Sequence, residues 1–318
     1  MKLAVAIFCF NRVQKLETLL CSVSSELRKS ELDFWIFHDG TNADNNTRHL
    51  QVQNLLNKYK FENPEVNIIT RGSNYGLRKN ILCGVNEVFN SCDAVIVLED
   101  DLELHENFFD FMKWGLQRYA LDDQVFSVNG WLPYNLRSDE VFMQKTFNCW
   151  GWATWKHKWT YTNYTDSLID KLPFEQIKFF CDNFESNSWS QIYLNYIGKK
   201  HTWAINTHLH LFLSDRYALY PKFSLVANHG EDGTGENSFR GNNAKASFYW
   251  HERIDENGFI DHHQSHRILA YRMYTNASRI KRLVFSLAFS KRTLMLLSSI
   301  VYSDFVINIR KKFALLSF

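Results

Sequence analysis

The sequence predicts an α/β fold, in which a sheet made mostly of parallel strands is flanked by helices. Two observations support this fold class. Over the first 130 residues, short apolar runs of strand length alternate with stretches whose apolar residues recur at helical spacing. Successive strand-like runs begin roughly 30 residues apart, which is the length of one strand and its crossover helix in a parallel sheet.

The individual elements follow in a regular order. The expected strands are the apolar runs at 2–10, 33–40, 65–70, 94–100 and 125–131. The expected helices, identified by amphipathic spacing, cover 12–27, 44–60, 77–90 and 105–120. Aromatic loops, short helices and glycine-rich turns then follow as far as residue 260. We therefore expect a first half over 1–130, a smaller second half over 131–262 and a helical tail over 263–318.

The composition and the cysteine pattern are typical of a globular protein with reduced cysteines. Hydrophobic residues make up 45% and charged residues 22% of 318 residues, an ordinary globular balance. None of the six cysteines forms a C-x-x-C pair, which argues against a structural zinc site. The opening "MKLAVAIFCFNR" lacks the features of an export signal. Reduced cysteines and no export signal predict a cytoplasmic protein.

The basic residues are concentrated in the tail. Residues 279–318 carry eight basic residues and one acid, so this segment is near +7 and the remainder near −5. Its basic clusters alternate with apolar stretches that are too short and polar for a confident membrane span. We expect an amphipathic helix on an anionic membrane surface. The alternative is a helix that docks on the sheet or on a second subunit. No nucleic-acid partner is expected.

Polar groups lie at the C-terminal ends of three of the expected strands, at 11–12, 38–40 and 99–101. Because parallel strands present their carboxyl ends at one edge of a sheet, these groups are expected to share a ligand site. Glu99, Asp100 and Asp101 are adjacent carboxylates, which a fold tolerates in solvent or around a cation such as Mg²⁺ or Mn²⁺. The alternative is a solvated start of a helix, where acids meet the helix dipole favourably. Dinucleotide and P-loop motifs are missing after the first strand.

Several segments resemble one enzyme family in the same order. "VIVLEDDLELHENFFDFM" is similar to the metal-site segment of glycosyltransferases with the glycosyltransferase A fold. "FNCWGWATWKHKW" and "WAINTHLHLFLSDRYALYPKFSLVANHGEDGTG" resemble the acceptor-side segments of bacterial members. The resemblance covers about residues 3–238. It is strongest to the N-acetylglucosaminyltransferase I family and its bacterial polysaccharide-biosynthesis relatives.

The resemblance implies roles in donor binding for the first half. Asp101 would be the direct ligand of Mn²⁺ or Mg²⁺, and His229 would be a further metal or phosphate contact. The remaining donor-site residues would border the nucleotide, its ribose or its diphosphate, and they are Asn11, Arg12, Asp39, Arg78, Glu99 and Asp100. His38 is expected to have a packing role. For Arg78 the alternative is a solvent-facing helix residue.

The second half would bind the acceptor and supply the catalytic base. Eukaryotic relatives have a carboxylate directly before the tryptophan that matches Trp203, but this chain has Thr202 there. The candidates that remain for the base are His201 and Asp232, with Asp215 in the same matched region.

The aromatic segment of the second half has two interpretations. Trp150, Gly151 and Trp152 would contact the acceptor sugar, with an indole stacked on the sugar face. Alternatively, they would form a packed tryptophan cluster.

The resulting hypothesis is a metal-dependent hexosyl- or N-acetylhexosaminyltransferase. Its donor would be a nucleotide diphosphate sugar, and its acceptor would be an oligosaccharide or a lipid-linked glycan. The setting would be bacterial surface polysaccharide synthesis (O-antigen, capsule or lipooligosaccharide), with the protein peripheral on the inner face of the plasma membrane. The alternatives are a nucleotidyltransferase and a catalytically weak glycan-binding protein on the same scaffold.

Overall fold

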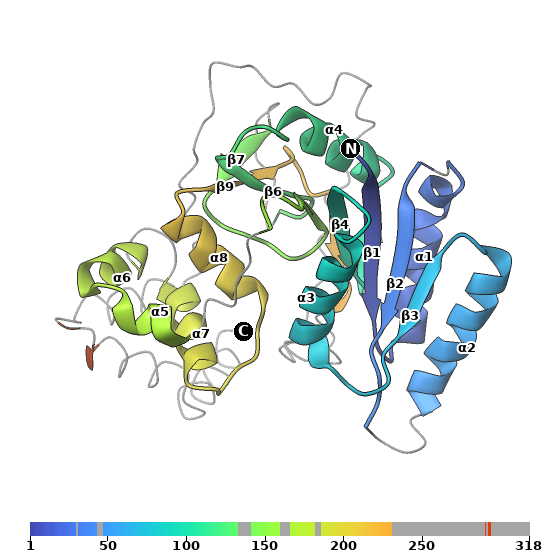
Figure 1. The fold of residues 1–318 in the computed structure, drawn as a ribbon, viewed down its shortest axis with the longest axis horizontal. Helices are drawn as coiled ribbons and strands as arrows, with labels where there is room; N and C mark the ends of the chain where they lie inside the picture. Colours follow the sequence, from blue (N-terminus) through green and yellow to red (C-terminus); the bar gives the residue numbers. More distant parts are fainter. Residues whose placement is uncertain are drawn as a thin grey trace, which may run out of the picture. The chain divides into compact units, whose positions relative to one another are not determined.

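The computed structural model describes residues 1–29, 31–42, 47–132, 141–159, 166–181, 186–230, 290 and 292–293. The described residues form two compact units (Figure 1). One contains those up to 159 together with 215–230, and the other contains those from 166 to 214. Asp232 and almost all of the basic tail lie outside the described residues. The expected division at residue 130 separates donor from acceptor roles, and it stays a prediction.

Within the described residues, the first unit is built on an eight-stranded sheet with the order β3-β2-β1-β4-β8-β6-β9-β7. The strands are β1 (Leu3–Cys9), β2 (Asp33–His38), β3 (Asn67–Thr70), β4 (Ala94–Glu99), β6 (Val125–Asn129), β7 (Phe142–Gln144), β8 (Trp152–Trp155) and β9 (Tyr217–Tyr220). Neighbours from β3 to β4 are parallel, as are β6 and β9, whereas β8 runs antiparallel to β4 and β6. The predicted mixed α/β fold is therefore confirmed.

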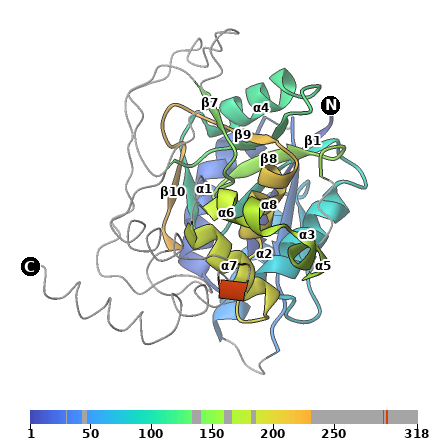
Figure 2. The ribbon, with the colours of Figure 1, turned by 90° about the vertical axis from the view of Figure 1, so that its left-hand side faces the viewer.

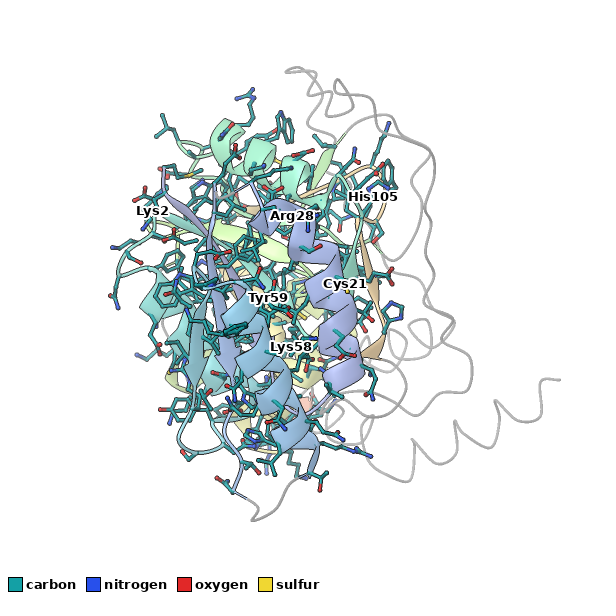
Figure 3. The ribbon with its side chains drawn as sticks, turned by 90° about the vertical axis from the view of Figure 1, so that its right-hand side faces the viewer. Lys2, Cys21, Arg28, Lys58, Tyr59 and His105 are labelled. Atoms are coloured by element: carbon teal, nitrogen blue, oxygen red, sulfur yellow. The ribbon has the colours of Figure 1, made fainter. Side chains whose placement is uncertain are left out.

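Helices cover both faces of the parallel strands, so β1 is buried along its whole length. The helices are α1 (Val13–Leu27), α2 (Thr47–Glu62), α3 (Gly76–Val88) and α4 (Phe108–Arg118). Helices α1 and α2 lie side by side on one face, and α3 lies on the other (Figures 1 and 3). Val5 and Leu16 share the core beneath α1, whereas a Cβ at Gly84 of α3 would lie 2.6 Å from the Phe8 ring. Alternate residues of β1 thus serve opposite faces.

A two-stranded antiparallel ribbon follows the acidic segment, where the sequence predicts only the approach to a helix. Strand β5 (Leu102–Leu104) pairs with β10 (Val226–Asn228), and α4 begins only after it. This pairing brings the chain near residue 230 back to the acids that follow β4. The ribbon therefore supplies a wall of the site that local sequence does not reveal.

The second unit is helical in the part that the structure describes. Its helices are α5 (Asp166–Lys171), α6 (Phe174–Phe180), α7 (Ser186–Tyr196) and α8 (Ala204–Leu213). Figure 2 shows α6, α7 and α8 close together, and they enclose an apolar core that includes Ile177, Trp189 and Leu209. None of the helices in the described residues of either unit is long and apolar enough to cross a membrane.

Candidate functional site

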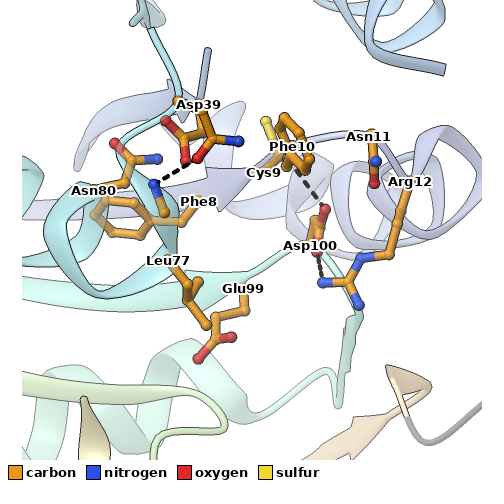
Figure 4. A pocket seen from close by; sticks show the side chains of 12 residues that line it. Phe8, Cys9, Phe10, Asn11, Arg12, Asp39, Leu77, Asn80, Glu99 and Asp100 are labelled. Atoms are coloured by element: carbon orange, nitrogen blue, oxygen red, sulfur yellow. Dashed lines mark hydrogen bonds and ion pairs between the residues drawn. The ribbon is translucent and has the colours of Figure 1, made fainter. Parts of the chain in front are cut away.

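A cavity of about 310 Å³ lies at the carboxyl ends of β1, β2 and β4 (Figure 4). The chain proceeds from β1 to β2 and β3 on one side of β1, and then places β4 on the other side of it. The order of the strands therefore reverses at β1. Ligands of open α/β sheets bind at such a reversal of strand order. Five residues predicted for donor binding line this cavity: Asn11, Arg12, Asp39, Glu99 and Asp100.

The acidic residues after β4 are held together by one guanidinium group. Arg12 directly precedes α1 and donates to Asp101 Oδ2 at 2.8 Å and to Asp100 Oδ1. The backbone N–H of Phe10 donates to the other oxygen of Asp100 at 3.4 Å. These contacts join β1 to β4 across 88 or more residues of chain. Arg12 thus lies at the expected place, but it contacts the acids directly, which the sequence analysis does not predict.

Burial and mutual repulsion shift the proton affinities of the cluster. Burial, followed by the charge of Asp101, raises the pKa of Glu99 to about 8. Burial likewise raises the pKa of Asp100 to about 6, although Arg12 opposes the shift. Burial alone would lower the pKa of Arg12, but the two aspartates outweigh it and raise that pKa. Burial therefore favours the neutral form of Glu99, and a single guanidinium faces three carboxyl groups in this cluster.

The buried oxygens of this cluster are not all satisfied. Asp101 and Glu99 are 8% and 9% exposed, and neither Asp101 Oδ1 nor Glu99 Oε1 has a hydrogen-bond partner among the described residues. Such atoms are costly unless another group reaches them. The described residues place no three His, Cys, Asp or Glu side chains around one point. This donor set fits Mg²⁺ or Mn²⁺, since such ions use one or two carboxylates and complete their shell with water and phosphate oxygens.

The end of β10 closes over Asp101. The backbone N–H of His229 donates to the carbonyl oxygen of Asp101 at 2.8 Å. A Cβ at Gly230 would lie 2.2 Å from Asp101 Oδ2, so the backbone there approaches the carboxylate closely. The imidazole Nε2 of His229 lies 2.8 Å from Glu103 Oε2. The structure therefore brings His229 beside Asp101 through its backbone, and its role as a metal ligand stays a prediction.

Asp39 shapes the opposite wall of the cavity. Its Oδ1 accepts hydrogen bonds from the backbone N–H groups of Gly40, at 2.9 Å, and of Tyr75, at 2.8 Å. These bonds fix the end of β2 to the start of α3. The site of Gly40 has no room for a side chain, because its Cβ would lie 2.4 Å from the backbone of Ser73. Asp39 is thus both a lining residue and a structural tie.

His38 is buried behind this wall. Its Nε2 lies 2.9 Å from the carbonyl oxygen of Phe10, and its Nδ1 lies 3.2 Å from Gln53 Oε1. The ring also stacks on His49 with 4.1 Å between centroids. Burial, and then the neighbouring His49, lower the pKa of His38. These contacts agree with the packing role expected for it.

Several predicted residues lie away from the lining, Asp101 among them. Arg78 is in the first turn of α3 and half-buried, but it does not line the cavity. His201 belongs to the second unit and is exposed. The neighbouring Thr202 is fixed to α7, because Asn195 donates to its carbonyl oxygen at 2.7 Å and accepts from its N–H at 3.1 Å. The catalytic role of His201 stays a prediction.

The segment 150–152 is largely built into the core. Trp152 is fully buried on β8 and offers no face to a ligand, so here the packing alternative holds. Gly151 has a positive φ of 67°, and a Cβ there would lie 2.8 Å from Val226. Only Trp150 is half-exposed, and it meets Trp131 edge-on at 4.3 Å between centroids. An acceptor role for this segment is therefore best assigned to Trp150, as a proposal.

One residue beside the acids is not predicted from the sequence. The thiol of Cys149 is close enough to Glu99 and Asp101 to feel their charges, and burial followed by these two charges raises the pKa of Cys149 well above the usual range. The cavity also gains an apolar lining from Phe8, Phe10 and Leu77. These residues look like ordinary core positions in the sequence, and only the strand order brings them to the site.

The chain shows similarity to solved structures but not to any protein-family model. No protein-family model and no curated protein matches the sequence. A crystal structure of S. aureus TarS 1–349 is similar at a TM-score of 0.37 and 12% identity, over 48% of this chain and 47% of that one. A crystal structure of GalNAc-T7 with UDP, GalNAc and Mn²⁺ is similar at a TM-score of 0.46 and 10% identity, over 71% of this chain and 44% of that one. This chain spans less than half the length of either, and at such similarity any activity has to be argued from the site itself.

Proposed function

We propose that this chain is a glycosyltransferase that uses a nucleotide diphosphate sugar as its donor. The observation that supports this most directly is the buried, partly unsatisfied acid cluster beside a cavity at the reversal of strand order. The site is anionic, and so is a diphosphate. An anionic ligand can bind beside Asp100 and Asp101 only when cations offset their repulsion.

The chain's own residues divide this work. Asp101, with Glu99 beside it, would hold a divalent cation, which supplies Lewis-acid stabilisation of the departing diphosphate when bound. Asp100 would keep Arg12, which lines the cavity, close to the phosphate oxygens of a bound donor. Asp39 and the apolar lining would face the nucleoside. Such fixed groups stabilise charge that develops on the leaving group.

The proposed acceptor site involves an indole face and a proton acceptor. Trp150 would meet a sugar face, and His201 or Asp232 would take the proton of the attacking hydroxyl. The resemblance to the N-acetylglucosaminyltransferase I family and its bacterial relatives supports a role in surface polysaccharide synthesis on an oligosaccharide or lipid-linked acceptor. Association of residues 279–318 with an anionic membrane surface belongs to the same proposal.

A ligand panel tests the donor assignment. Thermal unfolding would be followed with each common nucleotide sugar, with and without Mn²⁺, and hydrolysis of any stabilising donor would then be measured. We expect one donor to raise the melting temperature in a Mn²⁺-dependent way, since ligands that bind the native state stabilise it. Asp101→Asn should abolish this shift, whereas the exposed control Asp123→Asn should retain it.

Other outcomes would identify other functions. A Mn²⁺-dependent shift that survives in Asp101→Asn would remove the assigned cation site. Release of pyrophosphate from a nucleoside triphosphate would indicate a nucleotidyltransferase. Glycan binding without turnover of any nucleotide sugar would indicate a binding protein.

A further inference from the structure

We propose that Arg12 is an internal counter-ion that competes with the divalent cation for Asp101 and turns to the donor's diphosphate once that cation is bound. The proposal rests on the proposed function, because it takes Asp101 as the cation site. It adds a residue that controls the order of binding: the cation displaces Arg12, and the displaced guanidinium then helps to hold the anionic donor.

The two carboxylate oxygens of Asp101 have different surroundings. Its Oδ2 accepts a hydrogen bond from Arg12 at 2.8 Å, and the backbone at Gly230 crowds the same oxygen. Its Oδ1 is buried and has no hydrogen-bond partner among the described residues. One oxygen of the carboxylate is thus paired with Arg12, while the other is buried without a hydrogen-bond partner among the described residues. A cation that reaches Oδ1 must share a single carboxylate with the guanidinium group.

The positive charge of Arg12 opposes binding of a cation at Asp101. Arg12 contacts both Asp100 and Asp101, and its side chain is 19% exposed. A divalent cation at Asp101 would lie within a few ångström of this guanidinium, where two like charges repel strongly in a buried site. The repulsion weakens cation binding as long as Arg12 stays on the acids. It also gives Arg12 a reason to leave them when the cation is present.

The side chain of Arg12 can rotate while its backbone stays in place. Its backbone is fixed, because its carbonyl oxygen accepts the hydrogen bond from Leu16 N–H at 3.0 Å in the first turn of α1. Its side chain, by contrast, lines the cavity together with Asn11 and Asp100 (Figure 4). Rotation of the side chain alone therefore keeps the guanidinium at the cavity. A diphosphate bound there offers the bidentate oxygen pairs that arginine prefers.

The test measures the metal alone before any nucleotide is added. Mn²⁺ would be titrated into the full chain and its free fraction followed by electron paramagnetic resonance. We expect Arg12→Gln to bind Mn²⁺ about tenfold more tightly than the wild type, because the competing charge is gone. The matched control is Arg28→Gln, which removes an exposed arginine just beyond the other end of α1 and should leave the affinity unchanged (Figure 3).

The second arm uses inorganic pyrophosphate with saturating Mg²⁺ as a probe of the diphosphate site. Here Arg12→Gln should bind about tenfold more weakly than the wild type, opposite in sign to the metal titration. An arginine with a purely structural role would weaken both ligands on removal. An arginine that only binds phosphate would leave Mn²⁺ affinity unchanged. Either of these results would overturn the proposal.

Further variants keep the test decisive. If Arg12→Gln does not fold, Arg12→Met replaces it, because methionine also removes the competing charge while it keeps much of the length of the side chain. This variant should bind Mn²⁺ more tightly than the wild type, and equal or weaker binding refutes the counter-ion. If a nucleotide sugar binds with Mn²⁺ but Arg12→Gln shows no gain, only the counter-ion role fails. If the gain appears but no nucleotide sugar binds, the counter-ion role stands and the transferase function fails.

Discussion

The buried ammonium of Lys158 provides a sharp test of how this fold is stabilised. Its Nζ donates to three backbone carbonyl oxygens, those of Tyr119 at 2.6 Å, Asp122 at 2.8 Å and Val125 at 2.9 Å. It also lies 3.7 Å from the ring centroid of Trp155. One side chain thus satisfies the carbonyls between α4 and β6. We expect Lys158→Met to keep the volume of the side chain and remove all three bonds.

The magnitude follows from two opposing terms. Three hydrogen bonds to a charged group, at about 1.5–2 kcal/mol each, contribute roughly 4.5–6 kcal/mol in favour of folding. Burial lowers the pKa of Lys158 from 10.5 to about 8. A shift of this size corresponds to a cost of about 3 kcal/mol for burying the charge. The variant should therefore lose about 1.5–3 kcal/mol of unfolding free energy.

Urea denaturation followed by tryptophan fluorescence measures this loss as a lower transition midpoint at an unchanged slope. The control is Lys156→Met, an exposed lysine two residues away, which should remain within about 0.5 kcal/mol of the wild type. If Lys158→Met is as stable as this control, the three carbonyl contacts do not stabilise the fold and the reasoning is wrong.

Two further predictions concern the acid site and pH. Gly230→Ala would place a Cβ 2.2 Å from Asp101 Oδ2, so the affinity for a donor in the presence of Mn²⁺ should fall at least about tenfold. Isothermal titration calorimetry measures this affinity. The control is Gly72→Ala, where a Cβ has open space, and it should bind the donor as the wild type does. Burial would raise the pKa of Glu26, but ion pairs with two lysines lower it below 4.5. The ionised Glu26 therefore stabilises the fold above pH 4.5, and this stabilisation is lost as the pH falls below that value. Urea denaturation curves of the wild type and Glu26→Gln should thus differ at pH 7 and converge in acid. A difference in unfolding free energy that stays constant with pH would contradict this.

Much of the first unit is predictable because its signals are local. The apolar run 2–10 becomes β1, and the helical spacing over 12–27 becomes α1 with nearly the same bounds. A parallel strand buried on both faces needs a continuous apolar run, and the helix that covers it needs an apolar stripe. Both patterns are visible within a short window of sequence.

The rest depends on contacts that join distant segments. Strand β5 has three residues and forms only because β10 pairs with it more than 100 residues later. Trp152 reads as a candidate ligand contact, but insertion of β8 between β4 and β6 buries it. The sequence likewise places Arg12 and Asp101 at separate strand ends. That they share an ion pair follows from the adjacency of β1 and β4, which no local pattern specifies.

The strand order has a consequence for synthesis of the chain. Strands β1, β2 and β3 emerge first and can pair as a three-stranded sheet, but the second edge of β1 has no partner until β4 is made. The edge of β4 in turn stays open until β8 has left the ribosome. Unpaired edges invite association with other chains, and N-terminal segments fold first during translation. The nascent protein is therefore most prone to aggregation while the residues before Ala94 wait for β4.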